Sequence, residues 1–260
     1  MTQDPSGIEL FKAALELSHA PSQVPVRYFR RALDVEDKPD ESPVTVADRE
    51  TEDQLRRAIL ARFPDHGILG EEYGTTESAS ALTWIIDPID GTKSFISGLP
   101  LFGMLLGVLR DGVPEVGIIR MPALGECFAG LAGATATLNG EPIRCRPMPH
   151  LDQATIYLNE VNLVMVREPE RFTRLMTAGK LRRFAYDCYS YALLAMGHID
   201  AVVDYDLKPY DYLPVVPVIQ AAGGIITDWH GRALGLNSDG TVVAAGSPEV
   251  HAALLKLLAG

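Results

Sequence analysis

Apolar residues recur at helical spacing over residues 7–34, where they alternate with charged and polar side chains. This pattern predicts one or two amphipathic helices, interrupted at Pro21 and Pro25 because proline has no backbone N–H to donate inside a helix. After a polar segment, a second helical stripe begins behind Thr45, with Asp48 three residues later. That pair is typical of a capping box, so we expect a helix to begin here.

Short apolar runs bounded by turn residues predict strands in two parts of the chain. The candidate strands are residues 67–70, 82–86, 101–109, 115–120, 201–205, 224–228 and 242–245. Asp111 and Gly112 indicate a hairpin between the third and fourth runs. The later helices are expected over residues 190–197, 212–222 and 248–258. Residues 122–180 give no clear pattern. Because helices and strands mix along the chain, the sequence favours an α/β or α+β fold of packed layers in a single unit, residues 1–260.

The formal net charge of −11 argues against a basic nucleic-acid face, but it allows acidic residues to gather around a cation. The three cysteines, Cys127, Cys145 and Cys188, contain no CxxC pair, which is typical of a reduced cytoplasmic protein without a thiolate metal site. The first residues lack the pattern of a secretory signal, and the longest apolar run, near residues 101–109, is too short to cross a bilayer. We therefore expect a cytoplasmic protein without nucleic-acid or membrane partners.

The segment WIIDPIDGTK carries the most informative chemistry. A predicted buried strand ends at Asp87, Pro88 interrupts the strand pairing, and Asp90 follows after a turn. Gly91 and Thr92 then open a helix, so two carboxylates and a helix N-terminus meet at one point. Carboxylates are the oxygen ligands that Mg²⁺ prefers, and free backbone N–H groups can hold a phosphate. Together they would meet the needs of phosphoryl transfer to water, although two aspartates can also simply cap a turn.

Further acidic residues accompany this segment. Glu71 and Glu72 follow the strand candidate 67–70, and Asp211 opens a late helix. Taken singly, each acid has a structural explanation, because Asp48 and Asp211 can cap helices and the two glutamates can form a solvated turn. Lys38 can be an exposed lysine or lie near a metal or phosphate. Taken together and in this order, the acids favour a metal site over these explanations.

The order KPDESPVTVAD, GEE, WIIDPIDGT and a late aspartate before a helix ending in AAGG resembles the inositol monophosphatase family, from about Lys38 to Gly224. The resemblance implies a layered α-β-α-β-α sandwich, usually a homodimer. It also implies a phosphoric monoester hydrolase that acts on a small phosphorylated metabolite with two or three Mg²⁺ ions. A metal- and phosphate-binding half of about residues 1–145 would precede a substrate-specificity half of about residues 146–260.

The resemblance also assigns roles to individual residues. The positions that match the family's metal ligands are Glu71, Asp87, Asp90, Asp211 and, through its backbone carbonyl, Ile89. Gly91 and Thr92 match phosphate-binding amides. Asp48 and Thr92 match the pair that activates the attacking water, and Glu71 joins them as a catalytic residue because it matches the metal-bridging glutamate. Many relatives have Trp where this chain has Tyr210, so substrate preference is open at that position.

Two further acids bear on the substrate. Asp204 precedes Asp211 by seven residues, where inositol-specific relatives have a glutamate, and Asp187 matches a position that is small and neutral in those relatives. Extra acids beside the leaving group suggest a cationic substrate, unless Asp187 only caps the helix that begins near Tyr189. The segments DCYSYALLAMGHID and LKPYD resemble the histidinol-phosphatase branch of the family.

That branch implies hydrolysis of histidinol phosphate in histidine biosynthesis. One alternative is an inositol monophosphatase or related sugar-phosphate phosphatase. A second alternative, from another class, is a non-catalytic regulator that senses a metal or a phosphoester. A regulator of that kind would be expected to lose a ligand or the water-activating pair, and this chain keeps all of them.

Overall fold

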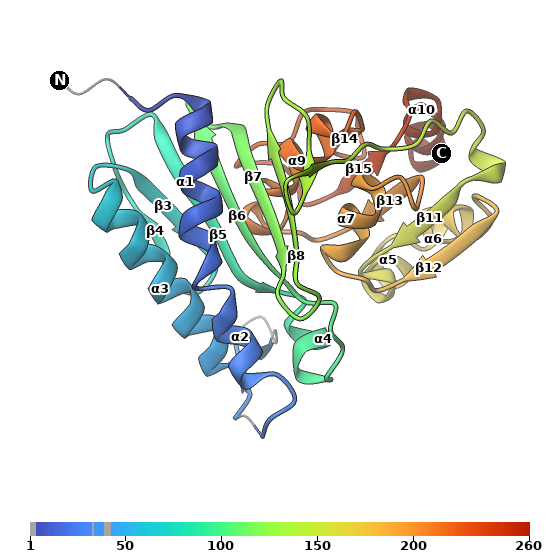
Figure 1. Ribbon diagram of the computed structural model, residues 1–260. Coiled ribbons are helices and arrows are strands. Elements are labelled where there is room, and N and C mark those ends of the chain that lie inside the picture. The colour runs from blue at the N-terminus through green and yellow to red at the C-terminus, as the bar shows by residue number, and fades with distance from the viewer. Residues whose placement is uncertain (1–3, 33, 39–42) are drawn as a thin grey trace.

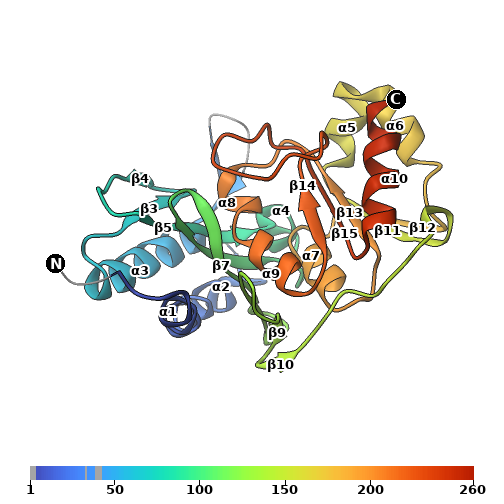
Figure 2. The same ribbon diagram turned by 90° about the horizontal axis from the view of Figure 1, so that it is seen from above.

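A computed structural model describes residues 4–32, 34–38 and 43–260 of the chain. Within these residues the chain forms two β-sheets, with helices between them and on both outer faces (Figure 1; Figure 2). A short strand pair, β1 Glu36–Asp37 and β2 Pro43–Val44, belongs to neither sheet. No helix in the described part combines the length and apolar character that a membrane span needs.

The larger sheet has the strand order β10-β9-β8-β7-β6-β5-β3-β4. Its strands are β3 Gly67–Gly70, β4 Gly74–Thr76, β5 Leu82–Asp90, β6 Gly103–Arg110, β7 Val113–Met121, β8 Glu126–Leu131, β9 Thr137–Leu138 and β10 Glu141–Pro142. Only the β3–β5 pairing among these is parallel. The predicted hairpin joins β6 and β7, where Asp111 and Gly112 both have the positive φ that a tight hairpin turn requires.

The smaller sheet has the order β12-β11-β13-β15-β14. Its strands are β11 Thr155–Leu158, β12 Leu181–Phe184, β13 Ala201–Asp204, β14 Ile225–Thr227 and β15 Val242–Ala245. The helices around the two sheets are α1 Gly7–His19, α2 Gln23–Tyr28, α3 Val46–Arg62, α4 Thr92–Ile96, α5 Val161–Arg167, α6 Pro169–Leu175, α7 Tyr189–Ala195, α8 Pro209–Tyr212, α9 Val215–Ala221 and α10 Pro248–Ala259.

Side-chain alternation along the strands builds the layers. On β5, Trp84 faces a core shared with α1 and α3, whereas its neighbour Ile85 faces a core shared with α7 and α9. That second core also receives Val202 and Ala244 from the smaller sheet. The opposite face of the smaller sheet packs against α5, α6 and α10 through residues such as Leu254. The order is therefore helix, sheet, helix, sheet, helix, and the expected α-β-α-β-α sandwich is confirmed.

Several local expectations need correction. Pro25 does not interrupt a helix but lies in the first turn of α2, where a missing N–H breaks no hydrogen bond. The helix expected over residues 212–222 is two short helices, α8 and α9, separated at Pro214. Strand β5 does not end at Asp87, because after an irregularity it pairs again at Asp90. Residues 122–180, which gave no pattern, include α5 and α6.

Candidate active site

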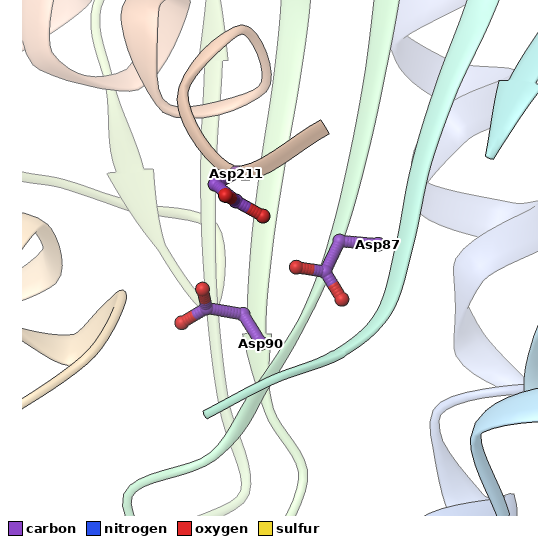
Figure 3. Close-up of side chains that lie close together, drawn as sticks. All are labelled: Asp87, Asp90 and Asp211. Carbon is purple, nitrogen blue, oxygen red and sulfur yellow. The ribbon is translucent and has the colours of Figure 1, made fainter. Parts of the chain in front are cut away.

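A cleft of about 630 Å³ lies where the end of β5 meets α5, α7 and α8. Among the acidic residues that line it, Asp87 and Asp90 from β5 and Asp211 from α8 form a cluster. Each of them has an oxygen within 4.8 Å of an oxygen of the other two. Figure 3 shows the three side chains pointing toward a common space. The chain thus brings together acids that are more than 120 positions apart in sequence.

The irregular end of β5 explains how Asp87 and Asp90 come to one side. Asp87 pairs with Leu105 and Asp90 with Gly103, and the register shifts between them. The Asp87 carboxylate accepts the N–H of Ile89 at 3.0 Å, which holds the backbone in a turn. A regular strand would send side chains three residues apart to opposite faces of the sheet. The irregularity therefore places both carboxylates at the mouth of the cleft.

The carboxylates of Asp90 and Asp211 each accept a hydrogen bond from a backbone N–H group in the second half of the chain. Asp90 accepts the N–H of Cys188, at the start of α7, at 2.6 Å. Asp211 accepts the N–H of Lys208 at 2.7 Å, so it caps α8 and also faces the cluster. Asp211 therefore both caps a helix and belongs to the carboxylate cluster.

Glu71 and Lys38 lie at the other side of the cluster. The Glu71 carboxyl group interacts directly with that of Asp87. The Lys38 ammonium lies 2.8 Å from a carboxylate oxygen of Glu71 and 2.6 Å from one of Glu72. Burial opposes the charge of Lys38, but the two glutamates outweigh it and raise the pKa of the lysine. Lys38 is therefore near the candidate metal ligands and is not an isolated surface lysine.

Asp48 combines a structural contact with a place at the site. One carboxylate oxygen accepts the N–H and the hydroxyl of Thr45, at 2.9 and 2.6 Å, which is the expected capping box of α3. The other oxygen lies 3.3 Å from the Thr92 hydroxyl, which is also 3.0 Å from the carbonyl of Ile89. Burial raises the pKa of Asp48. The capping bonds thus hold the Asp48 carboxylate next to Thr92, the first residue of α4.

The acidic cluster carries more negative charge than the described residues around it neutralise. Burial, followed by the neighbouring carboxylates, raises the pKa values of Asp87 and Asp90 well above their usual range. Burial likewise raises the pKa of Asp211 to about 7. Grouped carboxylates that repel one another in a buried site are a donor set suited to a hard divalent cation. The residues therefore fit a metal such as Mg²⁺.

Asp187 lies directly against the predicted phosphate-binding turn. Its carboxylate accepts the Ser94 hydroxyl at 2.5 Å, and a Cβ placed on Gly91 would lie only 2.8 Å from the Asp187 Cγ. Gly91 itself has a φ of 82°, at the start of α4. Helix α7 begins at Tyr189 without a side-chain cap, so the Asp187 carboxylate is not the helix cap considered from the sequence.

Asp204 lies deeper in the cleft, and its partners are neutral. Its carboxylate accepts the Asn159 amide at 2.8 Å, the Tyr191 hydroxyl at 3.1 Å and the N–H of Tyr205 at 2.9 Å. Burial raises its pKa to about 7. Both Asp187 and Asp204 therefore accept hydrogen bonds from neutral groups. Within the described residues, however, neither Asp204 nor Asp187 forms an ion pair with a basic side chain.

The cleft also contains residues that the sequence gave no reason to select. Glu160 pairs with Lys93 at 3.1 Å, and Arg167 pairs with Asp206 at 3.2 Å. These ion pairs connect α5 to α4 on one side and to the loop after β13 on the other. No motif marks them, and α5 itself was not predicted. Asn159, the partner of Asp204, was missed for the same reason.

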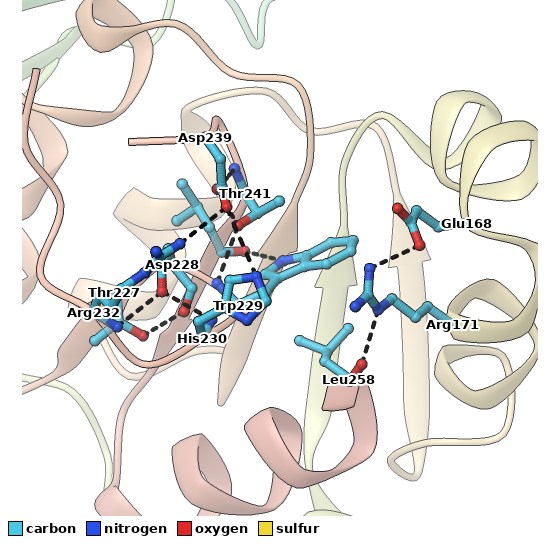
Figure 4. A network of polar contacts seen from close by, with 11 residues as sticks. Glu168, Arg171, Thr227, Asp228, Trp229, His230, Arg232, Asp239, Thr241 and Leu258 are labelled. Atoms are coloured by element: carbon cyan, nitrogen blue, oxygen red, sulfur yellow. Dashed lines mark hydrogen bonds and ion pairs between the residues drawn. The ribbon is translucent and has the colours of Figure 1, made fainter. Parts of the chain in front are cut away.

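The β14–β15 loop forms hydrogen bonds with two segments next to the cleft, the loop after β13 and the end of α8. Figure 4 shows its internal bonds, in which the buried Asp228 carboxylate accepts the backbone N–H and the Nε–H of Arg232 at 2.8 and 2.6 Å. At the end of the loop, the Gly240 carbonyl accepts the N–H of Leu207 at 3.0 Å. The Tyr212 hydroxyl donates to the Gly235 carbonyl at 2.8 Å. The loop thus holds both the cleft-lining Leu207 and the end of α8.

Comparison with known proteins agrees with this arrangement. The model of the inositol monophosphatase family matches residues 8–259. The chain is 41% identical over 251 residues to the chloroplastic bifunctional phosphatase IMPL2 of Arabidopsis thaliana, covering 93% of this chain and 72% of that protein. It is 37% identical over 235 residues to the histidinol-phosphatase of Chlorobaculum parvum, covering 89% and 90% of the two chains.

A solved structure is similar over the whole length. It is that of an inositol monophosphatase from Zymomonas mobilis, with a TM-score of 0.89 and 34% identity, and the match covers 99% of this chain and 100% of the other. The family match, the curated relatives and the shared fold are mutually consistent. The chain therefore belongs to the inositol monophosphatase family, a family of phosphatases.

Proposed function

We propose that this protein hydrolyses histidinol phosphate to histidinol in a Mg²⁺-dependent reaction of histidine biosynthesis. Two features of one cleft carry the proposal. A carboxylate cluster suited to a divalent cation lies at one place, and two acids without a basic partner among the described residues, Asp187 and Asp204, lie further along. Similarity at 37% identity to a histidinol-phosphatase supports this choice within the family.

Glu71, Asp87, Asp90, Asp211 and the Ile89 carbonyl would hold two or three Mg²⁺ ions, and magnesium dependence is general in the family. When bound, these ions supply positive charge to the phosphate and lower the pKa of a water molecule. The N–H groups at the Gly91–Thr92 turn would bind phosphate oxygens at the start of α4. Binding of a dianion next to these acids depends on that positive charge.

Asp48 and Thr92 would move the proton of the attacking water. The Thr92 hydroxyl can donate to Asp48 across 3.3 Å, which leaves its own oxygen free to accept a hydrogen bond from water. As the water attacks, its proton can pass to Thr92 and the threonine proton to Asp48. The raised pKa of Asp48 favours its role as the proton acceptor.

The charges of the leaving-group side support a cationic substrate. Glu160 and Asp206 are already paired with Lys93 and Arg167. Asp187, by contrast, has a hydroxyl as its hydrogen-bond partner, and it lies beside the phosphate-binding turn. An ammonium group near the phosphate of the substrate would form a charge-assisted hydrogen bond there, which is stronger than one from a neutral hydroxyl.

The second candidate is an inositol monophosphatase or related sugar-phosphate phosphatase. The observation in its favour is the 34% identity to the Zymomonas mobilis inositol monophosphatase over the whole chain. In this case Asp204, with its three neutral donors, would accept a ring hydroxyl in place of one of them. Substrate competition separates the two candidates.

The test compares phosphate release from histidinol phosphate and inositol 1-phosphate. We expect kcat/KM to favour histidinol phosphate by about a hundredfold, equivalent to roughly 2.7 kcal/mol. Asp187→Asn should reduce that ratio, mainly through KM, because the contact exists in both ground and transition states. The control is Asp53→Asn, which removes an acid from the outer side of α3, where it pairs with Arg57. A preference of the wild type for the polyol would favour the second candidate.

The proposal extends to the state of the protein. We propose a cytoplasmic homodimer in which residues 1–145 bind metal and phosphate and residues 146–260 select the substrate. Asp87 and Asp90 come from the first part, and Asp187 and Asp204 come from the second part, which also contributes Asp211 as one candidate metal ligand. Light scattering of the purified protein would test the dimer.

A further inference from the structure

Glu52 is a buried carboxylate to which neither the family resemblance nor the proposed mechanism gives a role. It lies on α3 one helical turn after Asp48, and none of its surface is exposed. Burial of a carboxylate is unfavourable unless its oxygens accept strong hydrogen bonds. Its partners therefore indicate what the residue does.

Glu52 holds the turn that carries Glu71. One carboxylate oxygen accepts the N–H of Glu72 at 2.7 Å, and the other accepts the N–H of Tyr73 at 3.2 Å. Arg56, one turn further along α3, donates its Nε–H to the second oxygen at 2.7 Å. The two backbone donors belong to the residues that immediately follow Glu71, so these bonds help to fix the backbone from which the Glu71 side chain extends.

The residue before Glu71 is fitted to the same carboxylate. A Cβ on Gly70 would overlap Oε1 of Glu52, so only glycine allows this close approach. Arg56 extends the arrangement, since its guanidinium also donates to the Gly74 carbonyl and to the Thr76 hydroxyl of β4. The turn is thus fixed to α3 on both sides of Glu71.

We propose that Glu52 is a positioning residue that holds Glu71 in the orientation needed for metal binding. This inference rests on the metal-ligand role of Glu71 in the proposed function. One helix then orders two parts of the site, because α3 presents Asp48 directly and places Glu71 through Glu52. Residues that orient metal ligands in this way typically contribute about 10- to 100-fold to metal affinity.

The test uses Glu52→Gln. The amide keeps the size of the side chain but offers one acceptor oxygen, so it places an NH₂ group against a donor in the turn. We expect the Kd of Mg²⁺ for the metal-free protein, measured by calorimetry, to rise by about tenfold or more. The Mg²⁺ concentration for half-maximal phosphate release should rise by a similar factor, with kcat at saturating Mg²⁺ largely retained.

A matched control separates positioning from general destabilisation. Asp200 is equally buried and accepts bonds from Arg146 and from the N–H of Thr155, but it immediately precedes β13 of the smaller sheet, outside the turn that carries Glu71. Asp200→Asn should lower the melting temperature without changing the Mg²⁺ affinity. Glu52→Asp, which keeps the charge on a shorter side chain, gives the same test if the glutamine variant does not fold.

The possible outcomes are distinct. Weaker Mg²⁺ binding in a folded Glu52 variant, but not in Asp200→Asn, supports the inference. Unchanged Mg²⁺ affinity in a folded Glu52 variant, or equal weakening in both proteins, overturns it. If the wild-type protein binds no Mg²⁺, the proposed function itself is wrong, because that measurement requires no substrate.

Discussion

Asp90 has a position that suits metal binding but is unfavourable for the stability of the folded protein. Its carboxylate lies within 4.8 Å of the cluster oxygens and also accepts the N–H of Cys188, which joins the two halves of the chain. Burial and then the charges of Asp187 and Asp211 raise its pKa. Such an arrangement is unfavourable for folding alone, and it is typical of functional sites.

Asp90→Asn should therefore separate activity from stability. We expect phosphate release to fall by at least about a hundredfold at limiting Mg²⁺, because a ligand charge is lost. The amide oxygen can still accept the Cys188 N–H, so the fold should persist. The melting temperature of the metal-free variant should exceed that of the metal-free wild type, since one repelling charge is gone. Near wild-type activity at limiting Mg²⁺ would contradict the assigned role.

His66 gives a prediction far from the cleft. Its Nδ1 accepts the indole N–H of Trp84 at 3.0 Å, so this nitrogen must be unprotonated, and the ring stacks on Phe63. Burial lowers the pKa of His66 below that of the unfolded chain. As the pH falls through about 6.5, the unfolded state binds the proton first, and stability is lost.

Urea unfolding at pH 7.5 and pH 5.5 tests this effect. The wild type should lose more stability between these values than His66→Gln, whose side chain can accept the Trp84 bond without titrating. A single group contributes at most about 1.4 kcal/mol per pH unit. The exposed His198, changed to Gln, is the control and should leave the pH dependence as in the wild type. Equal losses in all three proteins would refute the assignment.

Individual functional residues could be predicted from the sequence only where the residues around them in the chain also form a recognisable pattern. Asp87 and Asp90 could be recognised because strand, turn and helix signals surround them within ten positions. Asn159 and Arg167 could not, because their roles come from contacts with Asp204 and with Asp206, which are distant in the chain. Hydrogen-bond partners of this kind leave no local pattern.

Among the elements, α5 shows why residues 122–180 resisted assignment. Its sequence, VNLVMVR, is rich in β-branched residues and is nearly continuous in apolar character, which favours a strand. Only Val164 is buried, while Met165 and Val166 are exposed, so the helix shows no amphipathic stripe. Packing against the rest of the fold decides its structure. The clearer helices, such as α3 with its capping box, were predicted because their signals are local.

The β14–β15 loop yields a prediction at this scale. Gly240 has a φ of 81°, and a Cβ there would lie 2.5 Å from the Leu207 carbonyl oxygen. Gly240→Ala should therefore push residues 205–208 into the cleft and raise KM for the substrate by about tenfold, with a smaller effect on kcat. Steady-state kinetics of phosphate release measures this separation.

Gly231 provides the matched control, since it lies in the same loop with a φ of 78°. A Cβ at this position would meet only the flexible end of Leu255, at 3.1 Å. Gly231→Ala should cause similar backbone strain without changing KM. If both alanine variants change KM equally, the loop acts through stability alone, and its contact with Leu207 does not set the cleft.

For the whole molecule, the layers explain why a cluster of like charges can be tolerated. Apolar cores on both faces of the larger sheet and of the helices between the sheets fix β5 and α8 in place. The layered fold could be expected from the family resemblance and from mixed helix and strand patterns. The meeting of the two halves at Asp90 and Cys188 could not, because it depends on how the sheets pack.

The same reasoning predicts that Mg²⁺ stabilises the entire fold. A cation that binds only the assembled cluster shifts folding by mass action, by about 2.7 kcal/mol at 100 times its Kd. For a chain of this size that corresponds to a rise in melting temperature of about 5 to 10 °C. EDTA should reverse the rise and abolish phosphate release. Because salt also screens repulsion, NaCl at equal ionic strength is the control and should give a smaller rise. If Mg²⁺ and NaCl raise the melting temperature equally, the carboxylates bind no specific cation, and their repulsion is relieved by screening alone.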